Sequence, residues 1–148
     1  MTETKSTKSG FSAEERAAMQ QRADELRSTK GLKGAAKLAK ELEACVAAID
    51  ELDGVDRDVA VALHAIVSEE APHLNPKTFY GFPAYAKDGK VVVFYQPASK
   101  FDTRYGTVSF DETANLDDGE MWATSFAVIE MTDAAASRIR ELVKKAVS

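Results

Sequence analysis

The sequence has little of three things that would narrow its function: cysteine, histidine and long apolar runs. The single cysteine, Cys45, excludes an internal disulfide and a Cys-rich zinc module, and it is typical of a reducing compartment. The two histidines, His64 and His73, lack the spacing of paired metal ligands. No apolar run approaches the roughly 20 residues that cross a bilayer, and no secretory signal is visible. We therefore expect a cytoplasmic protein without a membrane partner.

Clustered positive charge is also missing, because the chain of 148 residues carries a net charge of -5. Binding to duplex nucleic acid depends on grouped Lys and Arg side chains, so we expect no such partner. The acidity is regional: from Glu41 to Asp58, seven acidic side chains stand against one base, Arg57. This run is either the solvated face of a helix or a surface that attracts a cation.

The length predicts one compact domain, with a core large enough to need no disulfide or structural metal. Within it we expect three parts: a disordered leader over residues 1–11, a helical extension over 12–53 and an α+β core over 54–148. Cys45 falls within the apolar stripe of the extension, which predicts a buried side chain rather than a reactive thiol.

Helical signals occupy the first half of the chain and its end. Ser12 and Glu15 form a capping-box pattern before a helix over 13–28, which has few large apolar residues and should pack loosely. Apolar spacing predicts further helices over 35–52 and 57–70, the second stopped by Pro72. Thr132 is placed to cap a final helix.

Strand signals fill the region between. Residues 78–86 and 91–96 flank a turn over 87–90, and 104–110 and 124–130 predict two more strands. Pro83 cannot donate to a ladder, so the first strand should lie at an edge or carry a bulge. Short connections favour an antiparallel sheet of about four or more strands, with helices packed on one face, which is an α+β fold.

Aromatic side chains concentrate in the predicted strands, and all four tyrosines lie there. Most must belong to the core, but the sheet face opposite the helices could present tyrosines beside positive charge. Such a tyrosine-lined face would bind a small anionic ligand or a protein. The candidate ligand-binding residues, which include the tryptophan after a carboxylate-rich loop, are Tyr80, Tyr85, Lys90, Lys100, Arg104 and Trp122.

Catalytic patterns are missing: the chain has no P-loop, no dinucleotide fingerprint after a strand and no nucleophile elbow. We therefore favour a noncatalytic binding protein. An enzyme whose catalytic groups assemble only in three dimensions is an alternative, ranked below both kinds of binding protein.

The segment from Asn75 to Val93 resembles the YdhG-like family of uncharacterised domains, whose hallmark is a Tyr-Gly-Met-Pro-Ala-Tyr stretch followed by a Gly-Lys turn. Phe82 stands where methionine is usual. The matching residues are Tyr80, Gly81, Pro83, Ala84, Tyr85, Gly89 and Lys90. The resemblance extends over about residues 54–147. It implies nothing about the structure or function of the N-terminal extension.

The resemblance implies a frataxin-like or YjbR-like α+β domain, and one branch of the family is described as an intracellular iron chaperone. Iron delivery of this kind uses surface carboxylates that hold the metal weakly. The residues that would supply them here, Glu43, Asp50, Glu51 and Asp53, belong to the acidic run of the extension. Weakly bound iron is therefore one expected partner, and the small anionic ligand or protein at the tyrosine-lined face is the alternative.

Overall fold

The computed structural model describes residues 10–148, so most of the predicted leader lies outside the described residues. The helices are α2 (Ala13–Ser28), α3 (Gly34–Asp50), α4 (Gly54–Glu70), the short α5 (Ala98–Phe101) and α6 (Asp133–Ala146). The strands are β1 (Asn75–Phe79), β2 (Phe82–Lys87), β3 (Lys90–Gln96), β4 (Gly106–Phe110) and β5 (Ser125–Val128). The predicted α+β fold is confirmed. Between residues 10 and 148, no helix is both long and apolar enough to cross a membrane.

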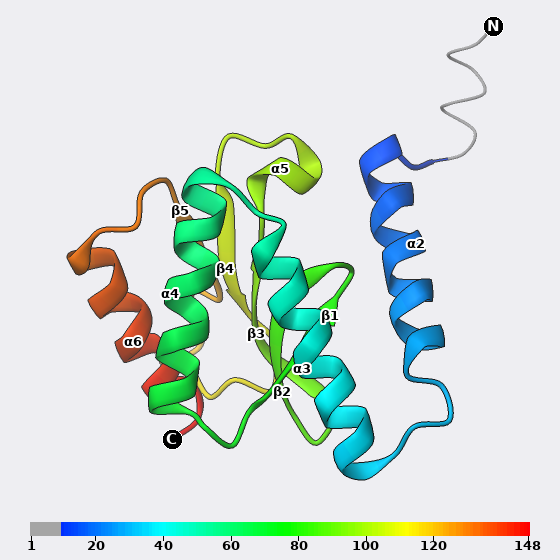
Figure 1. The fold of residues 1–148 in the computed structure, drawn as a ribbon. Coiled ribbons are helices and arrows are strands. Elements are labelled where there is room, and N and C mark those ends of the chain that lie inside the picture. The colour runs from blue at the N-terminus through cyan, green and yellow to red at the C-terminus, as the bar shows by residue number, and fades with distance from the viewer. Residues whose placement is uncertain (1–9) are drawn as a thin grey trace, which may run out of the picture.

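The five strands form one antiparallel sheet, and each strand pairs with its neighbours in the sequence. Figure 1 shows α3, α4 and α6 packed across one face, while α2 stands apart beside the β1 edge. We call the face toward α3, α4 and α6 the inner face, and the opposite one the outer face. Because side chains alternate along a strand, the register assigns each strand residue to one of these faces.

The first strand of the sequence prediction is two strands in the structure. Tyr80 and Gly81 both have positive φ, +56° and +82°, and form a two-residue hairpin turn between β1 and β2. Gly81 adopts this conformation without strain, whereas Tyr80 relies on its surroundings. The prediction of one continuous strand over 78–86 is therefore wrong.

The extra turn moves Pro83 into an internal strand, contrary to the expectation of an edge. Pro83 pairs with Thr78 of β1, but the ladder with β3 begins one residue later, at Ala84 opposite Phe94. The missing proline amide thus lies beyond the end of that ladder and costs no sheet hydrogen bond. The only register shift between β2 and β3 occurs at Tyr85 and Ala86, not at the proline.

Both predicted helix caps are confirmed. The Glu15 amide donates to Ser12 Oγ at 3.0 Å, and the Ser12 amide donates to Glu15 Oε1 at 2.9 Å, which completes the capping box. Thr132 Oγ1 accepts from the Ala135 amide at 3.1 Å at the start of α6. These bonds satisfy amides that have no partner inside the first helical turn.

The core lies between the inner face and the three helices that cover it. The sheet contributes Val93 and Val108, and α4 contributes Val59 and Leu63, all of them fully buried. Burial of each such side chain contributes about 2 kcal/mol to folding. The helix α3, although predicted to belong to an extension, adds Cys45 and Ile49 to the same core.

In contrast to α3, the helix α2 has no buried residue. A groove of about 260 Å³ separates it from α3, so the two helices pack together poorly. The expectation of loose packing for residues 13–28 is confirmed. A small number of contacts, at the ends of α2 and at the outer face, therefore hold this helix in place.

Candidate functional site

One of the two predicted ligand-binding tyrosines, Tyr85, is not on an open face. Tyr85 is only 1% exposed and pairs with Val93 on the inner face. Its hydroxyl lies 2.9 Å from His64 Nδ1 and accepts from the Cys45 thiol at 4.0 Å. The prediction that Tyr85 faces a ligand is wrong, because the turn at Tyr80 and Gly81 sets the alternation that directs it inward.

The Tyr85 hydroxyl therefore has two polar neighbours, His64 and Cys45. The direction of the bond between the Tyr85 hydroxyl and His64 Nδ1 depends on the imidazole tautomer, and the neutral form with an unprotonated Nδ1 accepts the hydroxyl proton. Burial lowers the pKa of His64 and so favours this neutral form. Burial likewise raises the pKa of the Cys45 thiol to about 11, although hydrogen bonds partly oppose the rise. Cys45 is thus the inert buried residue that the sequence predicted.

The other core tyrosine, Tyr95, donates its hydroxyl proton to Asp56 Oδ1 at 2.6 Å. Asp56 also accepts from the amides of Ala98 and Ser99, at 2.9 and 3.0 Å, and so joins the start of α4 to the start of α5. Burial favours a higher pKa for Asp56, but these hydrogen bonds outweigh it and hold the pKa below its ordinary value. A Cβ on Gly106 would lie 2.2 Å from the Tyr95 hydroxyl, so this position requires glycine.

The remaining predicted ligand-binding residues do not converge. Lys90 begins β3 and Lys100 lies in α5 beyond its other end, which places them about 20 Å apart along the strand. Arg104 lies over the ring of its neighbour Tyr105, at 5.0 Å. Trp122 precedes β5, at the opposite edge of the sheet from the Tyr80 turn. Within residues 10–148, Tyr80 and Lys100 line two different pockets.

The four predicted iron ligands are likewise dispersed. Glu43 forms an ion pair with Lys40 at 3.7 Å, and Asp50 forms one with Arg57 at 3.8 Å. Glu51 lines the groove toward α2, whereas Asp53 directly precedes α4. Across residues 10–148, no three His, Cys, Asp or Glu side chains lie close enough to hold a metal ion. The acidic run therefore does not fold into a ligand cage.

What the structure does bring together is a group of phenylalanines on the outer face. Phe79 pairs with Phe82 across the β1–β2 turn, and Phe94 follows on β3. The rings of Phe82 and Phe94 are stacked with centroids 6.2 Å apart, and Phe101 of α5 lies edge-on to Phe82 at 5.8 Å. We call Phe79, Phe82, Phe94 and Phe101 the aromatic platform. Such geometries are favourable for aromatic side chains.

The helix α2 covers one side of this platform and leaves a pocket of about 340 Å³ between them. Three side chains of the N-terminal segment with apolar surface, Phe11, Ala18 and Met19, form the opposite wall. Three side chains with polar groups also line the pocket: Glu15, Gln96 and Tyr80, the last of which is one of the predicted ligand-binding residues. The pocket lining is therefore mostly apolar, with a carboxylate, an amide and a phenol hydroxyl as its polar groups.

A carboxylate clamp fixes α2 over the platform. Glu25 Oε1 accepts from the Tyr80 amide at 3.1 Å, and Oε2 accepts from the Gly81 amide at 2.6 Å. The Arg22 guanidinium pairs with Glu25 at 3.3 Å and lies 5.3 Å from the centre of the Phe79 ring. The clamp thus satisfies both amides of the turn and ties α2 to the end of the platform.

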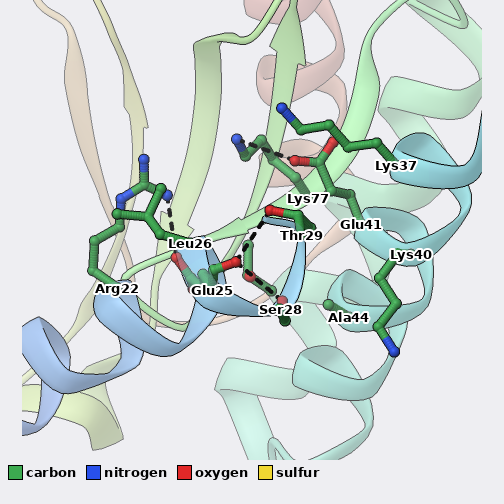
Figure 2. Close-up of a pocket in the computed structure, with 11 residues that line it drawn as sticks. Arg22, Glu25, Leu26, Ser28, Thr29, Lys37, Lys40, Glu41, Ala44 and Lys77 are labelled. Atoms are coloured by element: carbon green, nitrogen blue, oxygen red, sulfur yellow. Dashed lines mark hydrogen bonds and ion pairs between the residues drawn. The ribbon is translucent and has the colours of Figure 1, made fainter. Parts of the chain in front are cut away.

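Beyond the clamp, a small polar cavity of about 60 Å³ lies between the end of α2, α3 and β1 (Figure 2). Lys77 of β1 pairs with Glu41 of α3 at 3.5 Å, and both side chains are largely buried. Figure 2 shows Lys40 pointing away from this pair. The cavity has room for about two water molecules. Its ion pair joins α3 to the edge of the sheet, and we assign it a structural role.

Comparisons with known protein families, curated proteins and solved structures found no match to this chain. The case for a function therefore rests on the geometry of the molecule. The residues assemble the aromatic pocket, and the sequence signalled only part of it. Tyr80 is among the predicted ligand-binding residues, and Gly81 permits the turn that places Phe79 and Phe82 on one face.

Proposed function

We propose that the protein is a noncatalytic binding protein whose site is the aromatic pocket between α2 and the outer face. The observation that carries this proposal is the pocket of about 340 Å³ with the aromatic platform as its floor. Sites for small organic molecules commonly enclose about 300–1,000 Å³ and are lined by apolar and aromatic side chains with few polar groups.

The lining also defines the chemistry of the ligand. Stacked and edge-on phenylalanine rings favour a flat apolar molecule. The Glu15 carboxylate disfavours a negatively charged ligand, and its oxygens, like those of Gln96 and Tyr80, accept from a hydrogen-bond donor on the ligand. Glu15 is the one titratable carboxyl group in the lining, and its bond to the Ser12 amide assigns it to the helix cap. This arrangement supports binding rather than acid–base catalysis.

Iron delivery, the function implied by the YdhG-like resemblance, receives no support from the dispersed acids of residues 41–58, and we do not propose it. The small-ligand alternative is retained, with the platform phenylalanines beside Tyr80 in place of the rest of the predicted set.

The test is a fluorescence titration of the full chain with N-phenylnaphthylamine, a flat uncharged aromatic amine. Ala18→Trp would fill the pocket from α2, whereas Ala17→Trp adds the same side chain at an exposed position outside the lining. We expect Ala18→Trp to weaken probe binding by about tenfold or more and Ala17→Trp to leave it unchanged. Circular dichroism verifies that both variants are folded.

Met19→Glu gives a second variant, because Met19 is exposed on one side and its new charge would face the platform. Equal affinity of the probe for the native chain, Ala18→Trp and Met19→Glu would contradict the proposal, as would a native chain that does not bind the probe.

A further inference from the structure

A second feature, independent of the aromatic pocket, is the open edge of the sheet at β5. Within residues 10–148, β5 ends the strand order β1-β2-β3-β4-β5 and pairs with β4 alone. The Phe110 amide donates to the Thr124 carbonyl at 2.7 Å, and the register continues with Val108 opposite Phe126. The even-numbered residues of β5 therefore direct their backbone groups toward β4. By alternation, the backbone groups of Ser125 and Ala127 point to the open edge.

This edge lacks the features that usually prevent strand addition. From Ala123 to Ile129 there is no charged residue and no proline, although both are common means of protecting an edge. The other edge strand, β1, contains Pro76 and Lys77, and Lys77 is paired with Glu41 of α3. The two edges of one sheet therefore differ, and β5 is the unprotected one.

A groove of about 380 Å³ runs along the open edge between β5 and α6. Its lining includes the apolar side chains of Phe126, Val128, Ile139 and Leu142. Ile129, at the end of the strand, is 67% exposed. A strand added to β5 would satisfy the edge amides and carbonyls and place its inward side chains in this groove.

We propose that two copies of this chain associate through β5, in antiparallel pairing about a two-fold axis, to form one continuous sheet. In such a symmetric pair, Ser125 and Ala127 lie opposite residues of the other copy whose backbone groups also point to the open edge. Both side chains are small enough for the two strands to approach closely. It also places residues 121–123 of one copy beside residues 129–131 of the other. Exposed apolar side chains lie in both segments: Met121 at 87%, Trp122 at 39% and Ile129 at 67%.

This complementarity favours a second copy over a foreign peptide. Each chain brings both halves of the apolar contact, and association removes from water several large side chains that a single copy leaves exposed. Closed two-fold pairing also leaves no open edge at β5, so association stops at the dimer.

The experiment is sedimentation velocity of the full chain over a range of concentrations. We expect the native chain to reach twice the 16.1 kDa mass of one chain. Ala127→Pro deletes an amide that points to the open edge and is not needed by β4, so it should keep the fold and weaken dimerisation by about tenfold or more. Ala127→Thr is the matched control, because it changes the side chain but retains the amide.

Ile129→Lys is the second variant, since its exposed position tolerates a charge in the single chain but not in the paired edge. It also decides the case if Ala127→Pro proves unfolded by circular dichroism. A native chain that stays monomeric at every concentration overturns the proposal. So does a dimer that Ile129→Lys leaves intact, which would assign the interface to another surface.

Discussion

The inner face of the sheet carries Tyr85 and Tyr95 beneath three helices, whereas the outer face carries Phe79, Phe82 and Phe94 beside a single helix. On the inner face each tyrosine hydroxyl has a buried partner, His64 or Asp56. On the outer face the rings lack polar groups, and the helix that covers them has no buried residue. Hydrogen bonds fix the inner face in one arrangement, while the outer face keeps apolar space accessible. The stabilising polar network and the proposed binding site thus lie on opposite sides of one sheet.

The largest expected effect comes from Asp56→Ala on the inner face. The change removes the acceptor of Tyr95 and of two backbone amides, and leaves these donors without a partner. We expect the free energy of unfolding, measured by urea denaturation, to fall by about 3 kcal/mol. Asp58→Ala, at an exposed position of the same helix, should change it by about 0.5 kcal/mol or less. Equal losses in the two variants would show that helix charge, not the Asp56 network, matters.

A smaller and local effect is expected from Glu25→Ala, which opens the carboxylate clamp. The amides of Tyr80 and Gly81 lose their acceptor, worth about 1 kcal/mol of local stability. Hydrogen exchange in residues 13–28 should become about fivefold faster, while exchange in β2 and β3 stays unchanged. Asp24→Ala is the control, because the contacts of Asp24 with Gln20 and Arg27 stay within α2. Faster exchange throughout the sheet would mean that α2 is part of the cooperative core.

The smallest effect is a pH dependence of the inner face. Burial lowers the pKa of His64 from its ordinary 6.5, so the unfolded chain binds a proton more readily than the folded one. The stabilisation is complete above pH 6.5 and is lost as the pH falls from there toward the lower pKa of the folded state. His64→Gln should flatten this part of the urea-midpoint profile, and His73→Gln, at an exposed position, should not. A profile that His64→Gln leaves unchanged would contradict the assignment.

The sequence predicted those features that depend on local interactions. The capping box of Ser12 and Glu15, the Thr132 cap and the loose packing of residues 13–28 follow from side chains within one or two turns of a helix. The α+β class follows in the same way from the order of helical and strand patterns.

The site could not be predicted because one local feature controls it. Aromatic residues around Tyr80 favour a strand, and this propensity concealed the two-residue turn that Gly81 permits. Without the turn, the alternation of side chains along one long strand placed Tyr85 on the wrong face of the sheet. The pocket itself joins α2 to β1, β2, β3 and α5, and this meeting of segments distant in the chain has no periodic signature. The acids of residues 41–58 are close in sequence, yet helix geometry directs them to different neighbours.

The buried Cys45 gives the protein an internal reporter of its own motion. It is the one thiol of the chain, it has no exposed surface, and it lies on α3 against Tyr85. A thiol-reactive dye can reach it only after α3 lifts from the sheet, so the labelling rate measures the frequency of that opening. Because α2 contributes no residue to the core that holds Cys45, labelling separates motions of the core from events at the pocket.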